Sequence, residues 1–538
     1  MIVELISSVP APMWVAGAVA LSVGWGIRGN FGHEPGAALP GALAAMAVVL
    51  TSGRPDWFER VHWFALFGAF GWSFGGSISY MQVVGYTHSG HRPTQLYGYA
   101  NLFVIGFLWA ALGGAATTLP AVLSSEELSR FLVPILAVVV AWQIKEVLVD
   151  AFVRVDPARR HESPLYWYDS DWLDVLVALL AAGTVVLVRG GLDVATGLIL
   201  SLGVGWYAAF LPLVNLFRLR MTPPRGDNWA GCVGMVVAMG VYAKTRGWTP
   251  VLFALVAVGT LGGVGYALAQ LLKLVGIRSG RQTNWHSVLE QLQGAFHGLA
   301  LAFGMGVLSQ RLPPAPQGGV LPYWQSATGV GLVLLGLTYI NYRKATTTWV
   351  QQVASLPERF YRLPVAGFLL PSRGWIGWFE LVYLALTVVY LLGALWNADA
   401  PLVLLPATAA GRGMLLMLVF LWWCVVFNFE RALTGFAPAR IVTEWVIAIN
   451  AAFLSGWVIW GHRVVSAKAF RGNGLDERHA WTVLGLGLLL ELIALGVEFG
   501  GTRLLFGSQH APGAGLHIRF GPNRTAWSHR PRPGERHP

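Results

Sequence analysis

Two loops of related sequence carry the residue types best suited to bind an anion. Their polar residues are Arg28, Asn30, His33 and Glu34 in the first loop and Arg225, Asp227 and Asn228 in the second. A guanidinium group presents planar donors that match carboxylate and phosphate oxygens, and the free N–H groups of a following helix favour the same charge. The alternative is that each arginine marks the cytoplasmic end of a membrane span and that its polar neighbours cap helices.

A second pair of loops repeats the pattern Ser-Gly, then Arg-x-Thr followed by an amide. Its residues are Arg92, Thr94 and Gln95 in one copy and Arg281, Thr283 and Asn284 in the other, about 190 residues later. The helix after each loop also matches in places, with Asn101 opposite Glu290 and Phe107 opposite Phe296. We interpret the similarity as an internal duplication, with a chance match among Gly- and Ala-rich helices as the alternative.

An even number of spans separates the first two loops, so we expect two parallel repeats whose loops share one face. Transporters built from parallel halves bind their substrate between the halves. We therefore expect the duplicated loops to form one anion-binding mouth.

Ionisable residues within apolar stretches are candidates for proton coupling, because burying them in lipid is costly. Glu146 and Asp150 are four residues apart on one helix face beside Lys145, and Glu290 and His297 are seven apart on another. The alternatives are a structural ion pair at the first site and an interhelical hydrogen-bond cluster at the second.

No pattern in the sequence indicates a metal, a cofactor or catalytic residues. His33 and Glu34 could act as an acid and base, but adjacent residues do not share a helix face and the second loop has no counterpart. The two cysteines form no CxxC pair, and no Walker A or Gly-x-Ser-x-Gly pattern is present.

The composition of the chain places these loops in a membrane protein. Of the 538 residues 55% are hydrophobic and only 12% are charged, about half the usual share of charge. A soluble enzyme, a secreted disulfide scaffold and a disordered chain are excluded. The net charge of +11 is concentrated in loops and in the C-terminal tail, as beside anionic lipid, so we expect no nucleic-acid partner.

Apolar windows long enough to cross a bilayer recur along the chain. They are residues 12–28, 36–52, 62–85, 97–120, 131–152, 171–188, 194–217, 229–245, 249–274, 288–309, 322–341, 375–397, 401–428, 440–462 and 481–500. Arg412 interrupts one window, which could instead be a re-entrant half-helix before a full span. We predict an all-α polytopic membrane protein with about 14–15 transmembrane helices, comprising two parallel tandem repeats of about six helices and further C-terminal helices.

Five segments follow from these windows. They are repeat 1 (1–190), the core of repeat 2 (191–341), an interfacial cytoplasmic loop (342–374), C-terminal transmembrane helices (375–505) and a basic disordered tail (506–538).

The balance of Lys and Arg between alternate loops predicts an outside N-terminus and a cytoplasmic C-terminus, with Arg54 and Arg60 on the outer side. The abundance of Arg, Ala and Gly suggests a bacterial inner membrane.

These features favour a secondary-active transporter for a small anionic solute, and its transport could be coupled to protons. Two alternatives stay open: a membrane-embedded transferase acting on a lipid-linked or phosphate-bearing substrate, and a non-catalytic scaffold subunit of a membrane complex.

Overall fold

The computed structural model describes most of the chain as helices. It describes all residues except 1, 30, 33, 153–170, 220, 222–227, 317–322, 341–363, 366–367, 370–373, 400–403, 408, 436–437, 466–473 and 510–538. The only strands in these ranges are β1 (Pro364–Val365) and β2 (Phe368–Leu369), which pair antiparallel. An all-helical chain suits a bilayer, because helices satisfy their backbone hydrogen bonds internally.

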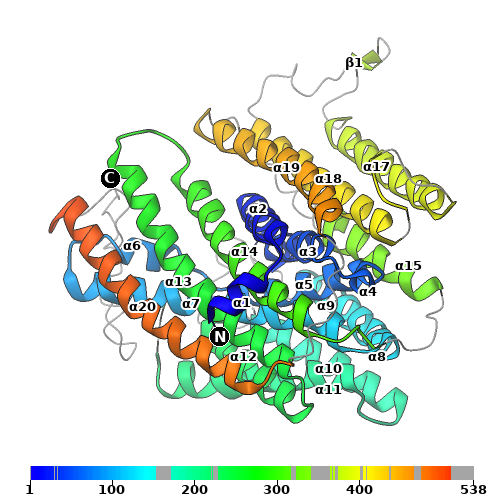
Figure 1. Cartoon of the computed structure of the whole chain (residues 1–538), viewed down its shortest axis with the longest axis horizontal. Helices are drawn as coiled ribbons and strands as arrows, with labels where there is room; N and C mark the ends of the chain where they lie inside the picture. Colours follow the sequence, from blue (N-terminus) through cyan, green and yellow to red (C-terminus); the bar gives the residue numbers. More distant parts are fainter. Residues whose placement is uncertain are drawn as a thin grey trace.

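Six helices form a closed ring at the centre of the molecule, each packed on the next (Figure 1). In order around the ring they are α2 (Ala11–Arg28), α3 (Glu34–Leu50), α5 (Val61–Gly75), α7 (Arg92–Val122), α13 (Thr249–Arg278) and α14 (Trp285–Arg311). Helices of the first predicted repeat thus pack directly on helices of the second, so the two are parts of one body.

Small residues bring the ring helices into close contact. A Cβ atom added to Gly298 of α14 would lie 2.0 Å from the backbone oxygen of Gly17 in α2, and one added to Gly294 would lie 2.4 Å from that of Leu21. Gly262 of α13 packs on Ala110 of α7 in the same way. Since lipid gives no hydrophobic drive for helix association, such contacts between small residues supply the packing energy.

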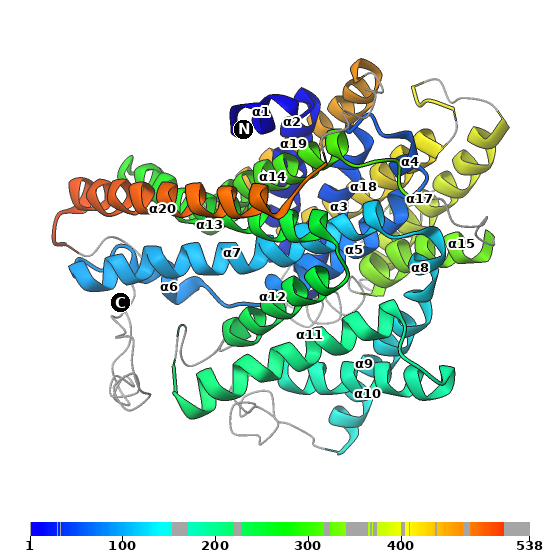
Figure 2. The same ribbon diagram turned by 60° about the horizontal axis from the view of Figure 1, so that its bottom comes forward.

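Four more helices form a layer against α5 and α7 (Figure 2). They are α9 (Leu132–Phe152), α10 (Asp171–Arg189), α11 (Val194–Phe210) and α12 (Asn228–Thr245). The short helix α8 (Ser125–Arg130) precedes α9, and the π-helical turn η3 (Leu211–Leu216) continues α11. Many leucines and valines of α9, α10 and α11 are exposed on their outer faces, as expected of side chains that contact lipid.

The C-terminal helices lie around the ring. Helix α20 (Glu477–Phe506) runs beside α7 and α13, as Figure 2 shows, and α19 (Pro438–Val464) packs on α2. Helix α18 (Ala409–Gly435) packs on α3 and α17 (Gly374–Asp399) packs on α18. The remaining short elements are α1 (Ile2–Ser8), α4 (Pro55–Phe58), α6 (Met81–Tyr86), α15 (Tyr323–Gly331) and the π-helical segment η4 (Leu332–Ile340).

Nine helices among the described residues are long and apolar enough to cross a membrane, and the bent pair α1–α2 would make ten. This fits a multi-pass membrane protein in a lipid bilayer. Every predicted window holds a helix, but several are too short to count as spans. The window 62–85 is broken because α5 ends at Gly75, and Arg412 lies within the single helix α18 rather than at a re-entrant break. The loop 342–374 and the tail lie almost wholly outside the described residues.

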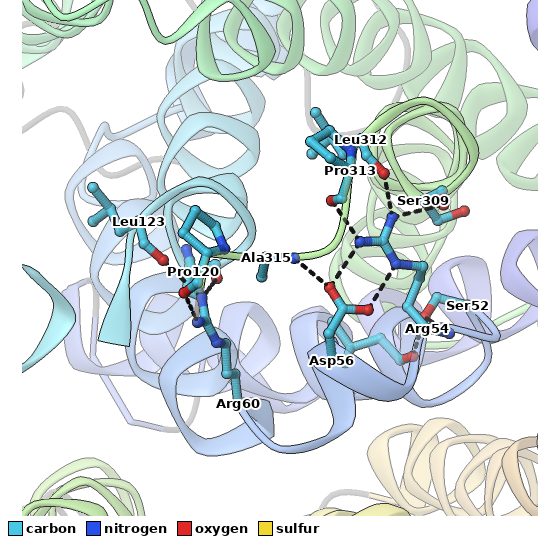
Figure 3. Close-up of polar contacts among 12 residues, drawn as sticks. Ser52, Arg54, Asp56, Arg60, Pro120, Leu123, Ser309, Leu312, Pro313 and Ala315 are labelled. Atoms are coloured by element: carbon cyan, nitrogen blue, oxygen red, sulfur yellow. Dashed lines mark hydrogen bonds and ion pairs between the residues drawn. The ribbon is translucent and has the colours of Figure 1, made fainter. Parts of the chain in front are cut away.

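Two arginines bind backbone carbonyls at the ends of α14 and α7, as Figure 3 shows. Arg28 lies at the opposite end of the ring. Arg54 donates from Nη1 to the carbonyl oxygens of Ser309 and Leu312 at 3.0 and 2.8 Å, where α14 ends. Arg60 donates from Nη1 to the carbonyls of Pro120 and Leu123 at 2.9 and 2.7 Å, where α7 ends. The last carbonyls of a helix lack partners within it and carry partial negative charge, so each guanidinium supplies both hydrogen bonds and charge.

The two arginine caps occupy matching positions. Ser309 and Pro120 are each two residues before the last residue of their helix, and Leu312 and Leu123 each follow it. The same shift along the chain relates Phe296 to Phe107 in the predicted duplication. Both arginines come from the loop between α3 and α5, so these caps do not test the duplication. Helix α12, at the start of the second predicted repeat, packs mainly on α11. The six-helix tandem repeat therefore stays a prediction.

Asp56 fixes the orientation of Arg54. Its carboxylate accepts hydrogen bonds from Arg54 Nε and Nη2 at 2.8 and 2.7 Å and from the backbone N–H of Ala315 at 2.8 Å. Burial acts to raise the pKa of Asp56, but these hydrogen bonds and the charge of Arg54 outweigh it, so the pKa lies below its ordinary value of 3.8.

The first prediction concerns the contact between α2 and α14. We expect Gly298→Ala to push the two helices apart and to destabilise the protein by about 1–3 kcal/mol, the usual cost of overpacking. Gly496→Ala in α20 is the matched control, because its added Cβ would meet nothing within 4 Å. Thermal unfolding in detergent would measure both, and an unfolding midpoint for Gly298→Ala equal to that of the control would contradict the packing argument.

The second prediction concerns Asp56. A carboxylate whose pKa is lowered by folding contributes stability above its ordinary pKa and loses that contribution as pH falls through the folded value. At pH 7 we expect Asp56→Asn to lower stability by about 1–3 kcal/mol, since Arg54 loses a charged hydrogen-bond partner. The difference from wild type should shrink below about pH 4. Denaturant titrations at pH 7 and pH 3.5 would test this, with Glu59→Gln, at an exposed position, as control.

Candidate functional site

A buried ion pair lies inside the ring, where α2 ends and α14 begins. Arg28 Nη1 is 3.6 Å from Glu290 Oε1, and the two side chains are only 4% and 3% exposed. Arg28 Nη2 also donates to the carbonyl oxygen of Gly76, just beyond the end of α5. Removing two charges from water is costly, so each charge of this pair depends on the other and on further hydrogen bonds.

Two more polar side chains surround Glu290. The Tyr80 hydroxyl donates to Glu290 Oε1 at 2.7 Å, and His286 Nε2 lies 3.5 Å from the same oxygen. The Tyr80 and His286 rings stack with centroids 6.1 Å apart. Because the His286 side chain is 42% exposed, it connects the buried carboxylate to the surface.

Aromatic rings enclose Arg28. Its guanidinium carbon lies 5.1 Å from the ring centroid of Trp25 and 5.7 Å from that of Trp109, within the range of a cation–π interaction. Trp109 stacks between Trp25, at 4.8 Å, and Tyr266, at 5.2 Å. Trp109 and Tyr266 are each the eighteenth residue of their long helices α7 and α13, so the site lies near the middle of both.

The glycines of the first predicted loop are explained by this geometry. A Cβ atom at Gly36 would lie 2.3 Å from the backbone oxygen of Arg28, which the start of α3 must approach closely. One at Gly29 would lie 3.4 Å from Glu290 Oε2. Asn30 and His33 lie outside the described residues, as does the side chain of Glu34, so their predicted roles stay predictions.

The second predicted loop reaches the same region through Asn228. Its amide donates to Ser77 Oγ, adjacent to the Gly76 carbonyl that Arg28 binds, and its Oδ1 accepts a 2.8 Å hydrogen bond from Trp206 Nε1. Arg28 and Asn228 thus contact consecutive residues of one segment. Arg225 and Asp227 lie outside the described residues.

The Arg-x-Thr loops lie farther from the ion pair. Arg92 begins α7 and is exposed, about 25 Å along the helix axis from Trp109. Thr94 accepts or donates a 2.9 Å hydrogen bond with His91, and Gln95 is buried. Arg281 is also exposed, Thr283 is partly buried, and Asn284 caps α14 by accepting from the Ser287 N–H. The structure does not bring Arg92 beside Arg28.

The predicted proton-coupling residues fall at two places. Glu146 is half-exposed and pairs with Lys145, which also binds Asp174 of α10 at 2.6 Å. The Lys145–Asp174 ion pair links α9 to α10 away from the ring. The side chain of Asp150 lies outside the described part of the chain. Glu290 and His297 both face the ring interior.

His297 is fully buried, with Trp25, Trp109 and Tyr266 around it, so it shares the aromatic cluster of Arg28. No hydrogen bond joins His297 to Glu290 in the described structure.

Three residues of the site were missed in the sequence. Tyr80 lies in the segment between α5 and α6, where the predicted span 62–85 hid the break. His286 is four residues before Glu290 on one helix face, a spacing that could have identified it. Tyr266 gives no signal in the sequence, because its role depends on the packing of α13 against α7.

Within the described ranges, no group of three His, Cys, Asp or Glu side chains is placed to hold a metal ion. Searches for similar proteins add no family: no family model, curated protein or solved structure matches the chain. The functional argument therefore depends on the geometry of the site.

The third prediction tests the mutual dependence of Arg28 and Glu290. We expect Glu290→Gln to cost about 3–5 kcal/mol, because it leaves a buried guanidinium without its anion. The double variant Arg28→Met/Glu290→Leu should recover most of that loss, since no uncompensated charge remains.

Unfolding in detergent would measure the stability of these variants, with Glu146→Gln at a half-exposed position as control. If the loss in the double variant equalled the summed losses of Arg28→Met alone and Glu290→Leu alone, the two side chains would act independently.

Proposed function

We propose that the chain is a secondary-active transporter that carries a small anionic solute together with a proton. The observation that carries the proposal is the buried Arg28–Glu290 pair, with His286 beside it near the surface. An arginine keeps its charge at all physiological pH values, so Arg28 always needs an anion. Either the Glu290 carboxylate or an anionic solute can supply it.

Competition for Arg28 would couple the two substrates. When Glu290 takes up a proton, its carboxyl group becomes neutral and releases Arg28 to a carboxylate or phosphate of the solute. When the solute leaves, Glu290 must give up its proton to restore the pair. This exchange moves one proton with each negative charge, and the half-exposed His286 offers the proton a path to Glu290.

The two ends of the ring differ, which supports a single orientation of the protein in the membrane. Arg28 and Arg54 lie at opposite ends of α3, and Arg54 and Arg60 hold the ends of α14 and α7 together with buried hydrogen bonds. We place the Arg28 end towards the cytoplasm of a bacterial cell, with the N-terminus outside and the C-terminus inside. Arg92 and Arg281, both exposed at the Arg28 end, would collect anions from solution.

A second candidate is a transferase that acts on a lipid-linked substrate. It is favoured by a cavity of about 130 Å³ between the ring and the outer layer, lined almost wholly by apolar side chains. Phe74 and Trp206 line this cavity, and they are neighbours of Ser77 and Asn228. A lipid tail in the cavity would bring its headgroup near the segment that Arg28 binds.

The fourth prediction separates these candidates in proteoliposomes. With an inward proton gradient, we expect wild type to take up one or more members of a panel of radiolabelled carboxylates and phosphates. Arg28→Gln should abolish this uptake, whereas Glu290→Gln should keep exchange of solute for solute but lose the response to the proton gradient. Arg92→Ala and Arg281→Ala should raise the half-saturating solute concentration without changing the proton dependence.

Arg130→Gln, at an exposed position at the other end of the ring, serves as the control and should transport normally. Unchanged uptake by Arg28→Gln would refute the proposal. If no anion is taken up and the purified protein instead modifies a lipid-linked phosphate, the transferase is favoured.

A further inference from the structure

A second group of buried polar side chains lies away from Arg28, where α20 packs on α7 and α13. Helix α20 buries one stripe of residues, and the two glutamates in that stripe are Glu491 and Glu498, seven positions apart on one face. Glu491 is 7% exposed and Glu498 is fully buried. The outer face of the same helix carries exposed leucines such as Leu488, Leu492 and Leu504. The two glutamates therefore lie on the face of α20 that packs against the protein.

Neither carboxyl group has a partner among the described residues. The four oxygens of Glu491 and Glu498 are buried and accept no hydrogen bond, and neither residue forms an ion pair. An ionised carboxylate in such surroundings is costly, and two of them within range of each other's charge cost more. A neutral carboxylic acid avoids both costs, so a proton on each group is the physically consistent state.

The residues opposite Glu498 can hold and relay a proton. The Tyr99 hydroxyl of α7 forms a 2.5 Å hydrogen bond with Thr502 of α20, one turn beyond Glu498, and lies within electrostatic range of that glutamate. Gln95, one turn before Tyr99 on the same face of α7, is fully buried with both its amide atoms unpartnered. The two buried acids without hydrogen-bond partners, with the Tyr99 hydroxyl within electrostatic range of Glu498, indicate a site that can take up a proton.

A chain of polar groups leads from Tyr99, whose hydroxyl interacts with Thr87, towards the surface. Gln270 of α13 donates to Thr87 Oγ1 at 2.9 Å, and Thr87 contacts Nδ1 of the buried His88 at 3.1 Å. His91, three residues further, is exposed. Two other charged groups lie in this region: Lys273 of α13 is buried, and Arg503 of α20 donates to the carbonyl oxygen of Gly90 at 3.0 Å.

We propose that Glu491 and Glu498 form a proton-binding site between α20, α7 and α13, which exchanges protons with solution through the segment Thr87–His91. On loading, a carboxylate oxygen of Glu498 accepts the proton; on release, the proton returns through His88 to water. This site is distinct from Arg28–Glu290, and the proposal holds whether or not that pair binds a solute.

The fifth prediction uses a hydrophobic carbodiimide on the full-length protein in detergent. Carbodiimides add to protonated carboxylic acids in apolar surroundings. We expect labelling of Glu498 or Glu491, located by peptide mass spectrometry, that declines as pH rises and is indifferent to sodium. The variants Glu498→Gln and Glu491→Gln should each lose their own label, while Glu477, exposed at the start of α20, should not be labelled. Protection by sodium chloride would assign the site to a metal cation and overturn the proton.

A second measurement does not depend on access of the reagent. A buried glutamate that stays neutral in the folded state makes stability decline as pH rises above the ordinary glutamate value, because the unfolded chain ionises there and the folded chain does not. We expect the unfolding midpoint of wild type to fall between pH 6 and pH 9 and that of Glu491→Gln/Glu498→Gln to fall less. Parallel pH profiles for the two proteins would refute the proposal even if no label forms.

Discussion

The permanent charge of Arg28 is the constraint that the centre of this protein must satisfy. A guanidinium group cannot be neutralised at the depth where Trp25 and Trp109 enclose it, so the fold has to deliver an anion and a carbonyl to it. Glu290 comes from α14 and the carbonyl of Gly76 from the end of α5. Both contacts therefore depend on the end of α5 and the first turns of α14 lying beside Arg28.

Close helix packing makes that arrangement possible. The backbones of α2 and α14 approach so closely at Gly17 and Gly298 that no side chain fits between them, and the antiparallel course of the two helices brings Arg28 to Glu290. At the opposite end, Arg54 and Arg60 satisfy the carbonyls at which α14 and α7 end. One end of the ring is thus closed by arginines bound to backbone, and the other holds an arginine bound to a carboxylate.

Much of this could be predicted from the sequence, and the remainder depends on contacts that sequence patterns do not encode. Every apolar window contains a helix, and the sequence identifies both Arg28 and Glu290 as candidates, from a loop motif and from a place in an apolar helix. Their pairing was not predicted, because no periodicity relates α2 to α14. The break after Gly75 was missed for a similar reason: hydropathy continues through it, and only the neighbouring Arg28 makes a free carbonyl acceptable there.

The late position of Glu290 in the chain affects how the protein must be assembled. Tyr80 and Glu290 are 210 positions apart, and Arg28 is synthesised earlier still. While the intervening helices are being synthesised, Arg28 lacks the Glu290 carboxylate and the Tyr80 hydroxyl lacks its acceptor. An unpaired guanidinium is costly in lipid, so we expect the N-terminal helices to reach their final packing only after α14 has been synthesised and the ring has closed.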